Sequence, residues 1–422
     1  MMAFGNPVVF SQTMNSLSFL SLATSPEANG MGGIAASTST DNAMAVAANP
    51  GQLGLMSLSN YFVGSTNEPK TQLLPELQLD GLTYYNTVVN VGINLQRVFP
   101  ISFPLSVGGG YSRILLNLGK FFVADMSPTP TYIFDGSEES ETYTIGIGCD
   151  YLVKVGVGYS SRHLKSTIAV FDIQRSGLEN SASASMSDIG IISQIPVLDI
   201  VSKLRKEPIG DFLGMTPSVD LTLGYVLSNY GSESATYFDN DFNEPFPRKA
   251  TFGFSWKAGL LCHAAEHEWE LTSFTFGREV EDILFNRIPA IIDPITNVMV
   301  TRPSFDYLSG FGHIEFLKNV ILGERTGNVT IRKGWQLSLG ELVYLRGGST
   351  NEADQELSSK GLGVRLAGLL KLLETLTPRA MSASHLDFIL DHFDIRFDHS
   401  SVSSSRFPTH DASYDGLNVI LR

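Results

Sequence analysis

The sequence alternates apolar and polar residues with a period of two in several separate stretches. In residues 89–96 (VNVGINLQ) every odd position is aliphatic and every even position is polar or glycine. Successive side chains of a β-strand point to opposite faces, so this period predicts strands with one apolar and one polar face. The same pattern recurs in residues 143–151, 219–225, 252–257, 335–339 and 362–366, and the last expected strand covers residues 417–421.

A soluble β-sandwich alternates in the same way, so other features have to decide what the apolar faces contact. The polar faces hold mainly Gly, Ser, Thr and Asn, and Tyr, Trp and Phe lie near strand ends. Transmembrane barrels have such a polar interior and such aromatic girdles. Short links alternate with long polar stretches such as 113–141 and 228–250, as turns and outer loops do in these barrels. We therefore predict an all-β fold, a transmembrane antiparallel β-barrel of about fourteen strands with about ten residues each.

The composition argues against some classes of function. The chain has 422 residues, of which 29 are Lys or Arg and 43 are Asp or Glu, so its net charge of −14 argues against a nucleic-acid partner. Only 17% of the residues are charged, against about a quarter in soluble domains. No apolar run reaches the roughly 18 residues that a spanning helix needs. Cys149 and Cys262 have no metal-binding spacing, and we expect two separate thiols.

The first part of the chain differs in kind from the rest. It is rich in Ala, Ser, Gly, Asn and Met, and no Lys or Arg occurs before Lys70. Such a segment is too polar to span lipid and too small-residued to form its own core. We expect residues 1–55 to form a hatch or plug inside the lumen and residues 56–422 to form the barrel. A secretory signal would begin with basic residues, so we expect that a signal has been trimmed or that the start codon is misassigned.

Two segments do not fit the strand pattern. Residues 178–215 combine a Ser-rich stretch with clustered aliphatic residues, which suits either one short helix or an irregular pair of strands. Residues 366–376 place Lys371 and Glu374 on one side of an apolar segment, as a short amphipathic helix would.

Three blocks of sequence resemble the PorV/PorQ family of outer-membrane proteins, which belongs to the FadL-like barrel superfamily. Residues 19–54 resemble its N-terminal signature, with Gly30-Met31-Gly32 and Asn49-Pro50 at the matching positions. Residues 221–256 resemble its strand, turn, tyrosine-bearing loop and following strand, and residues 335–368 resemble its penultimate hairpins.

The resemblance implies a bacterial outer-membrane barrel with an N-terminal hatch. It also implies a non-enzymatic protein that binds or shuttles secreted cargo at the cell surface. The implied partners are outer-membrane lipid, cargo proteins, and sortase or translocon components of type IX secretion. The alternative is a FadL-like channel for passive uptake of hydrophobic molecules. An apolar, gapped lumen would favour the channel, whereas a sealed lumen with aromatic outer loops would favour the cargo binder.

The candidate site residues of the hatch are Gly30, Met31, Gly32, Asn49 and Pro50. Proline fixes φ and glycine permits close packing in a narrow lumen, so their first interpretation is structural. A role in gating or ligand contact comes only from the resemblance. Strand glycines such as Gly108–Gly110 suit a bend in the wall, which in a FadL-like barrel would open a lateral gap.

No catalytic residue, cofactor or resident metal is predicted. The motif His263-Ala264-Ala265-Glu266-His267 has the spacing of an inverted zincin, but it falls at a hairpin turn rather than on a helix. Asp391, His392 and Asp394 form a candidate cation site within a wider Asp/His cluster, because hard cations prefer oxygen ligands. The simpler interpretation places these polar residues in the lumen or a loop, with Phe393, Ile395 and Phe397 facing lipid. A lipid-modifying enzyme that uses Asp391 and His392 is a third function class.

Overall fold

The structure is a computed structural model. It describes residue 20 and residues 25–59, 61–72, 81–100, 102–123, 132–168, 180–206, 210, 214–232, 234–237, 242–264, 267–288, 291–292, 299–301, 304–327, 329–352, 355–376, 390, 392–404 and 412–421.

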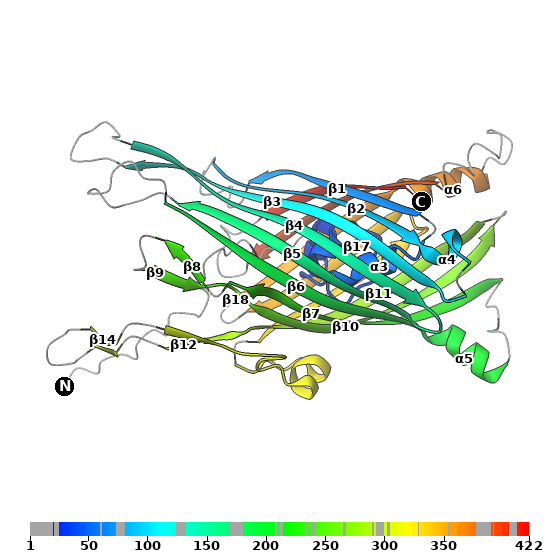
Figure 1. Cartoon of the computed structure of the whole chain (residues 1–422). Coiled ribbons are helices and arrows are strands. Elements are labelled where there is room, and N and C mark those ends of the chain that lie inside the picture. The colour runs from blue at the N-terminus through cyan, green and yellow to red at the C-terminus, as the bar shows by residue number, and fades with distance from the viewer. Residues whose placement is uncertain are drawn as a thin grey trace, which may run out of the picture.

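Fourteen antiparallel strands form one closed barrel, which confirms the expected fold class. Each barrel strand pairs with the previous and the next one along the chain, and the first closes on the last (Figure 1). The barrel strands are β1 (Tyr61–Gln72), β2 (Leu82–Asn94), β3 (Leu105–Val123), β4 (Tyr132–Asp150), β5 (Lys154–Ile168), β6 (Asn180–Pro196), β7 (Met215–Gly231), β10 (Lys249–Ala264), β11 (His267–Ile283), β16 (Thr330–Leu339), β17 (Val343–Glu352), β18 (Gln355–Arg365), β19 (Phe393–Ser404) and β20 (Ala412–Leu421).

The remaining elements belong to connections and to the N-terminal segment. Three short two-stranded sheets are formed by β8 (Ser234–Tyr237) with β9 (Phe242–Pro245), β12 (Phe285–Ile288) with β15 (Ser304–Tyr307), and β13 (Ile291–Ile292) with β14 (Met299–Thr301). The helices are α1 (Pro26–Gly30), α2 (Ala45–Ala48), α3 (Gly51–Met56), α4 (Leu95–Val98), α5 (Val197–Arg205), the π-helix η4 (Phe316–Leu322) and α6 (Leu366–Leu376). None of the helices in the described part of the chain is long and apolar enough to cross a membrane.

The two faces of the wall follow the alternation in the sequence. In β2, Tyr84, Asn86 and Val88 are buried on the lumen side, whereas Val89 and Val91 are 41% and 50% exposed on the outside. In β19, Phe393, Ile395 and Phe397 are exposed on the outside, as expected. The apolar sides of the strands therefore form the outer surface of a barrel and are not pressed against a second sheet.

Several strands are longer than the sequence pattern predicted. Residues 113–141, expected as a polar connection, contain the last part of β3 and the first part of β4. β3 and β4 have 19 residues each, whereas about ten are enough to cross a membrane. A strand that continues into water needs no apolar face there, so the alternation is lost although the ladder persists. Residues 178–215 contain β6, the helix α5 and the first residue of β7. The helix expected over residues 366–376 is present as α6.

The two ends of the barrel differ in their connections. β1 begins at Tyr61 and β20 ends at Leu421 at the same end of the barrel, where the connections 151–153 and 340–342 are tight. The longest connection between barrel strands, 284–329, is at the other end. Barrels of the outer membrane have short turns on the periplasmic side and longer loops outside. We therefore name the end with Tyr61 the periplasmic end and the opposite one the outer end.

The strands that close the barrel pair over a short distance. Within the described strands, β1 pairs with β20 from Val63↔Leu421 to Asn67↔Leu417. By comparison, β10 pairs with β11 from Lys249↔Ile283 to Ala264↔His267. Pro69 lies just beyond the paired part of β1, and the β1–β2 register shifts there. Proline has no N–H and cannot donate to a ladder, so the closing seam ends before it.

Candidate functional site

The described residues of the N-terminal segment, 25–59, lie inside the barrel. Figure 1 shows α3 within the ring of strands. The segment contacts opposite parts of the wall, since α3 packs on β4 and β5 while α1 packs on β18 and β19. Its polar groups bond to the wall: Ser106 Oγ donates to Gly54 O (2.8 Å), and Asn90 Nδ2 donates to Ala43 O (2.8 Å). We name residues 25–59 the inner segment.

The candidate residues Gly30, Met31 and Gly32 lie where the inner segment contacts β16, β17 and β18. Gly32 has φ +72°, a left-handed conformation that favours glycine, and a Cβ on it would clash with the backbone of the wall. Its N–H donates to Ser359 Oγ (2.9 Å), and its carbonyl accepts from Thr350 Oγ1 (2.8 Å). These residues therefore form a close packing contact between the backbone of the inner segment and the backbone of the wall.

The candidate residues Asn49 and Pro50 lie on the opposite wall. Asn49 is fully buried, and its Nδ2 donates to Ala36 O (2.7 Å) and to Ile191 O of β6 (3.1 Å). Its Oδ1 accepts from Gly51 N–H (2.9 Å), which starts α3. Asn49 therefore links two parts of the inner segment to the wall and orients the helix that follows.

Charged side chains fix the inner segment on the side of β17 to β19. Arg396 Nη2 donates to Glu27 Oε2 (2.5 Å), and Arg365 Nη2 donates to Asp41 Oδ2 (3.0 Å). Asp398 accepts from both Arg346 (2.6 Å) and Arg396 (2.8 Å). The sequence pattern did not identify this buried network. The available signal was that Glu27 and Asp41 are the only charged residues among positions 1–60.

A second carboxylate binds the backbone of the inner segment directly. Glu279 of β11 is 1% exposed, and its Oε1 accepts from Ala35 N–H (3.1 Å), Ser37 N–H (2.7 Å) and Ser37 Oγ (2.8 Å). Bonds from several donors compensate the loss of water around a buried carboxylate. Glu279 thus fixes the loop between α1 and α2 against the wall.

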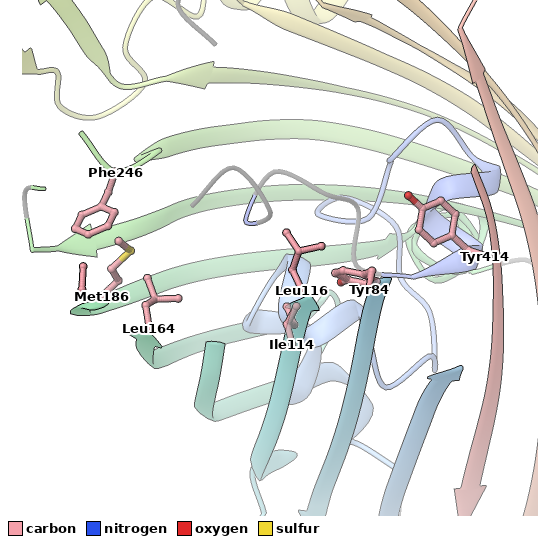
Figure 2. Packing of buried hydrophobic residues seen from close by; sticks show 8 residues of the cluster. Tyr84, Ile114, Leu116, Leu164, Met186, Phe246 and Tyr414 are labelled. Carbon is pink, nitrogen blue, oxygen red and sulfur yellow. The ribbon is translucent and has the colours of Figure 1, made fainter. Parts of the chain in front are cut away.

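Apolar side chains gather in the outer half of the lumen. This cluster, the apolar collar, comprises Tyr84, Ile114, Leu116, Leu164, Ala182, Met186, Phe246 and Tyr414. Figure 2 shows them on the lumen side of β2, β3, β5, β6 and β20, with Phe246 contributed by the connection before β10. The interiors of transmembrane barrels are usually polar, so an inward-facing apolar cluster is a distinct feature of this lumen.

Two cavities lie on either side of the inner segment. A cavity of about 100 Å³ is lined by Leu20 and Ile114, which also contact or belong to the apolar collar. Its lining also includes small residues and the charged side chains of Arg162, Lys249, Glu279, Glu281 and Arg332. A larger cavity of about 630 Å³ opens at the periplasmic end, where Asp150, Glu341 and Lys371 line it. The inner segment separates the two, because Ala28, Ala35 and Ala36 line the first and Thr38, Thr40 and Asp41 line the second.

The candidate cation residues are only partly brought together. Asp394 faces the lumen, and its Oδ2 accepts from Arg365 Nε (2.7 Å). His392 is exposed, and Asp391 lies outside the described residues. Within the described part of the chain, no three His, Cys, Asp or Glu side chains are grouped to hold a metal ion. In the HxxEH motif, His263 pairs with Glu268 and His267 with Ala264 in the β10–β11 ladder, and Ala265 and Glu266 lie outside the described residues. Cys149 and Cys262 are free thiols.

A closed barrel with an apolar outer surface and a polar, partly filled interior defines the class: the chain is a β-barrel of the bacterial outer membrane. No protein-family model matches the chain, and no curated protein sequence matches it.

Among solved structures, the chain is similar to the CymD monoaromatic hydrocarbon channel, with 11% identity, 94% of this chain and 96% of that chain covered, and a TM-score of 0.39. It is also similar to the Ralstonia pickettii toluene transporter TbuX (10% identity, 94% and 96% covered, TM-score 0.39). A third similar structure is a Pseudomonas aeruginosa FadL homologue (8% identity, 94% and 97% covered, TM-score 0.35).

Proposed function

We propose that this protein is a channel for passive uptake of hydrophobic molecules, the FadL-like alternative among the functions expected from the sequence. The proposal rests on the apolar collar and not on the likeness to hydrocarbon channels. An apolar molecule that leaves water gains about 25 cal/mol for each Å² of its surface that the collar covers. The collar adjoins the cavity of about 100 Å³, and Ile114 belongs to both.

The inner segment acts as the gate of this channel in the proposal. An apolar cavity of about 150 Å³ is enough to hold benzene, and the cavity under the collar, at about 100 Å³, is smaller. A hydrocarbon that leaves the collar therefore has to displace part of the inner segment before it reaches the periplasmic cavity. The structure then corresponds to the closed state.

Uptake of toluene tests the proposal in cells that have no other hydrocarbon channel. Leu164→Glu and Met186→Glu place a charge in the collar, and we expect each to lower the uptake rate about tenfold, as a loss of about 1.4 kcal/mol would. Lys165→Glu is the matched control, because Lys165 follows Leu164 in β5 and is exposed on the other face. Equal uptake by the collar variants and the control would refute the role of the collar.

The shuttle of secreted cargo, expected from the PorV/PorQ resemblance, stays a prediction that the same cells can separate from uptake. If the unaltered protein takes up no toluene, and its deletion removes secreted proteins from the cell surface, the shuttle replaces the channel as the function. If uptake is lost on deletion while surface proteins are unchanged, the channel stands.

A further inference from the structure

Part of the longest connection lies against the outside of the barrel wall. Residues 309–327, which include η4, pack on β7, β10 and β11, and we name them the external flap. Phe311 stacks on Tyr225 with ring centroids 4.6 Å apart, and Phe316 lies 5.5 Å from Phe252. Tyr225 and Phe252 are on the outer face of the wall, since the next residues, Val226 and Gly253, are buried on the lumen side. Figure 1 shows this helix, in yellow, outside the strands next to β10.

Polar residues of the wall hold the external flap in place. Arg278, on the outer face of β11, donates from Nη1 to Val320 O (2.9 Å) and Ile321 O (2.6 Å). Asp282, which lies four residues further along the same face of β11, accepts a hydrogen bond from His313 N–H (2.6 Å) and is fully buried. Charged groups on the outer face of a barrel are costly in lipid. The external flap thus provides hydrogen-bond partners for two charged residues on the outer face of the wall.

The external flap also has its own internal structure. Asn319 is fully buried: its Oδ1 accepts from Glu315 N–H (2.6 Å), and its Nδ2 donates to Glu324 O and Thr326 Oγ1 (both 2.8 Å). Val320 packs with Val280 and Ile331 of the wall. Hydrogen bonds inside the external flap and apolar contacts with the wall therefore both fix the conformation of the flap.

The face turned away from the barrel is mostly apolar, apart from the exposed ion pair between Lys318 and Glu315. Its large apolar side chains are between 49% and 64% exposed: Phe311, Phe316, Leu317, Ile321 and Leu322. So many large apolar side chains in one short segment mark a surface that contacts something other than water.

This face continues the lipid-facing surface of the neighbouring strand. Tyr225, under Phe311, pairs in register with Ile191 of β6, and Leu227 pairs with Ile189. Ile191 and Ile189 are 43% and 55% exposed on the outer face, where the barrel contacts lipid. The external flap therefore lies beside, and not above, the membrane-contacting part of β6.

We propose that the external flap is a membrane-binding element whose apolar face is immersed among the acyl chains of the outer leaflet. The leaflet follows from its place on the outer half of β10 and β11. Lipid is favoured over a protein partner because the apolar face is continuous with the lipid-facing wall and because the segment covers the charged wall residues Arg278 and Asp282.

Spin labels in phospholipid vesicles test this. In the full chain with Cys149→Ser and Cys262→Ser, a nitroxide is attached at Leu317→Cys or Leu322→Cys. Collisions with molecular oxygen, which concentrates in hydrocarbon, are compared with collisions with a water-soluble nickel complex. Ile145→Cys in β4 is the lipid reference, since Ile145 is 64% exposed on the outer face, and Ser304→Cys in β15 is the exposed loop reference.

We expect the labels at Leu317 and Leu322 to give an oxygen-to-nickel ratio equal to that at Ile145 and several-fold above that at Ser304. A ratio equal to that at Ser304 would place the face in water and overturn the proposal. Low access to both reagents with an immobilised spectrum would mean that protein covers the face, and would overturn it as well. Heat-dependent mobility on a gel verifies that each labelled variant is folded.

Discussion

At the scale of single residues, the buried charges of the lumen carry a stability cost when one partner is lost. Arg396 contacts both Glu27 and Asp398. Arg396→Met leaves their carboxylates buried with one cation fewer, and we expect the free energy of unfolding to fall by about 3–5 kcal/mol. Arg113→Met is the control: Arg113 pairs with Glu139 at a site where its side chain is 48% exposed, and such pairs are worth about 1 kcal/mol or less. Urea unfolding in detergent micelles measures both, and equal losses would contradict the prediction.

A carboxylate at the periplasmic end makes stability depend on pH. Burial by itself raises the pKa of Glu341, but the N–H of Glu270 and the ammonium of Lys371 outweigh it and hold this pKa below its usual value. A lowered carboxyl pKa contributes stability that is present above the usual value of about 4.5 and is lost as the pH falls through the folded-state pKa. We expect Glu341→Gln to lower the unfolding midpoint at pH 7 and to leave the midpoint at pH 3 almost unchanged. A constant difference across this range would contradict the role of Glu341.

At the scale of elements, α3 depends on glycines in the wall. A Cβ on Gly148 of β4 would clash with Gly54 O, which is backbone and cannot move aside without moving α3. Gly148→Val should therefore displace α3 and speed amide hydrogen exchange over residues 51–56. Gly109→Val in β3 is the matched control, because a Cβ there meets nothing within 4 Å. Unchanged exchange in Gly148→Val would show that the contact does not hold α3.

The strands could be predicted where lipid constrains them. Val89, Val91 and Ile145 alternate with polar residues because one face contacts hydrocarbon and the other the lumen. The outer parts of β3 and β4 lie beyond that constraint, and their sequence lost the period. The site was predicted by residue type only for the inner segment, through Gly32 and Asn49, since tight contacts restrict residue size. The ion pairs between the inner segment and the wall join residues 324 and 369 positions apart, and no local pattern encodes such a pairing.

At the scale of the whole molecule, every barrel strand is paired on both sides. A closed barrel has no unpaired strand edge at which the ladder could start to open. We expect the unheated protein to migrate differently from the boiled protein in dodecyl sulfate gels and to require detergent for solubility. Identical migration, or a soluble protein without detergent, would contradict the membrane barrel.

The short seam between β1 and β20 joins the first and the last strand of the barrel, so the final contact to form is also the most distant in the sequence. Until β20 pairs with β1, the sheet has two unprotected edges that can recruit other chains. Assembly of this protein is therefore most vulnerable to aggregation while it waits for its last strand, and a chaperone that caps the edge of β1 would protect it at that moment.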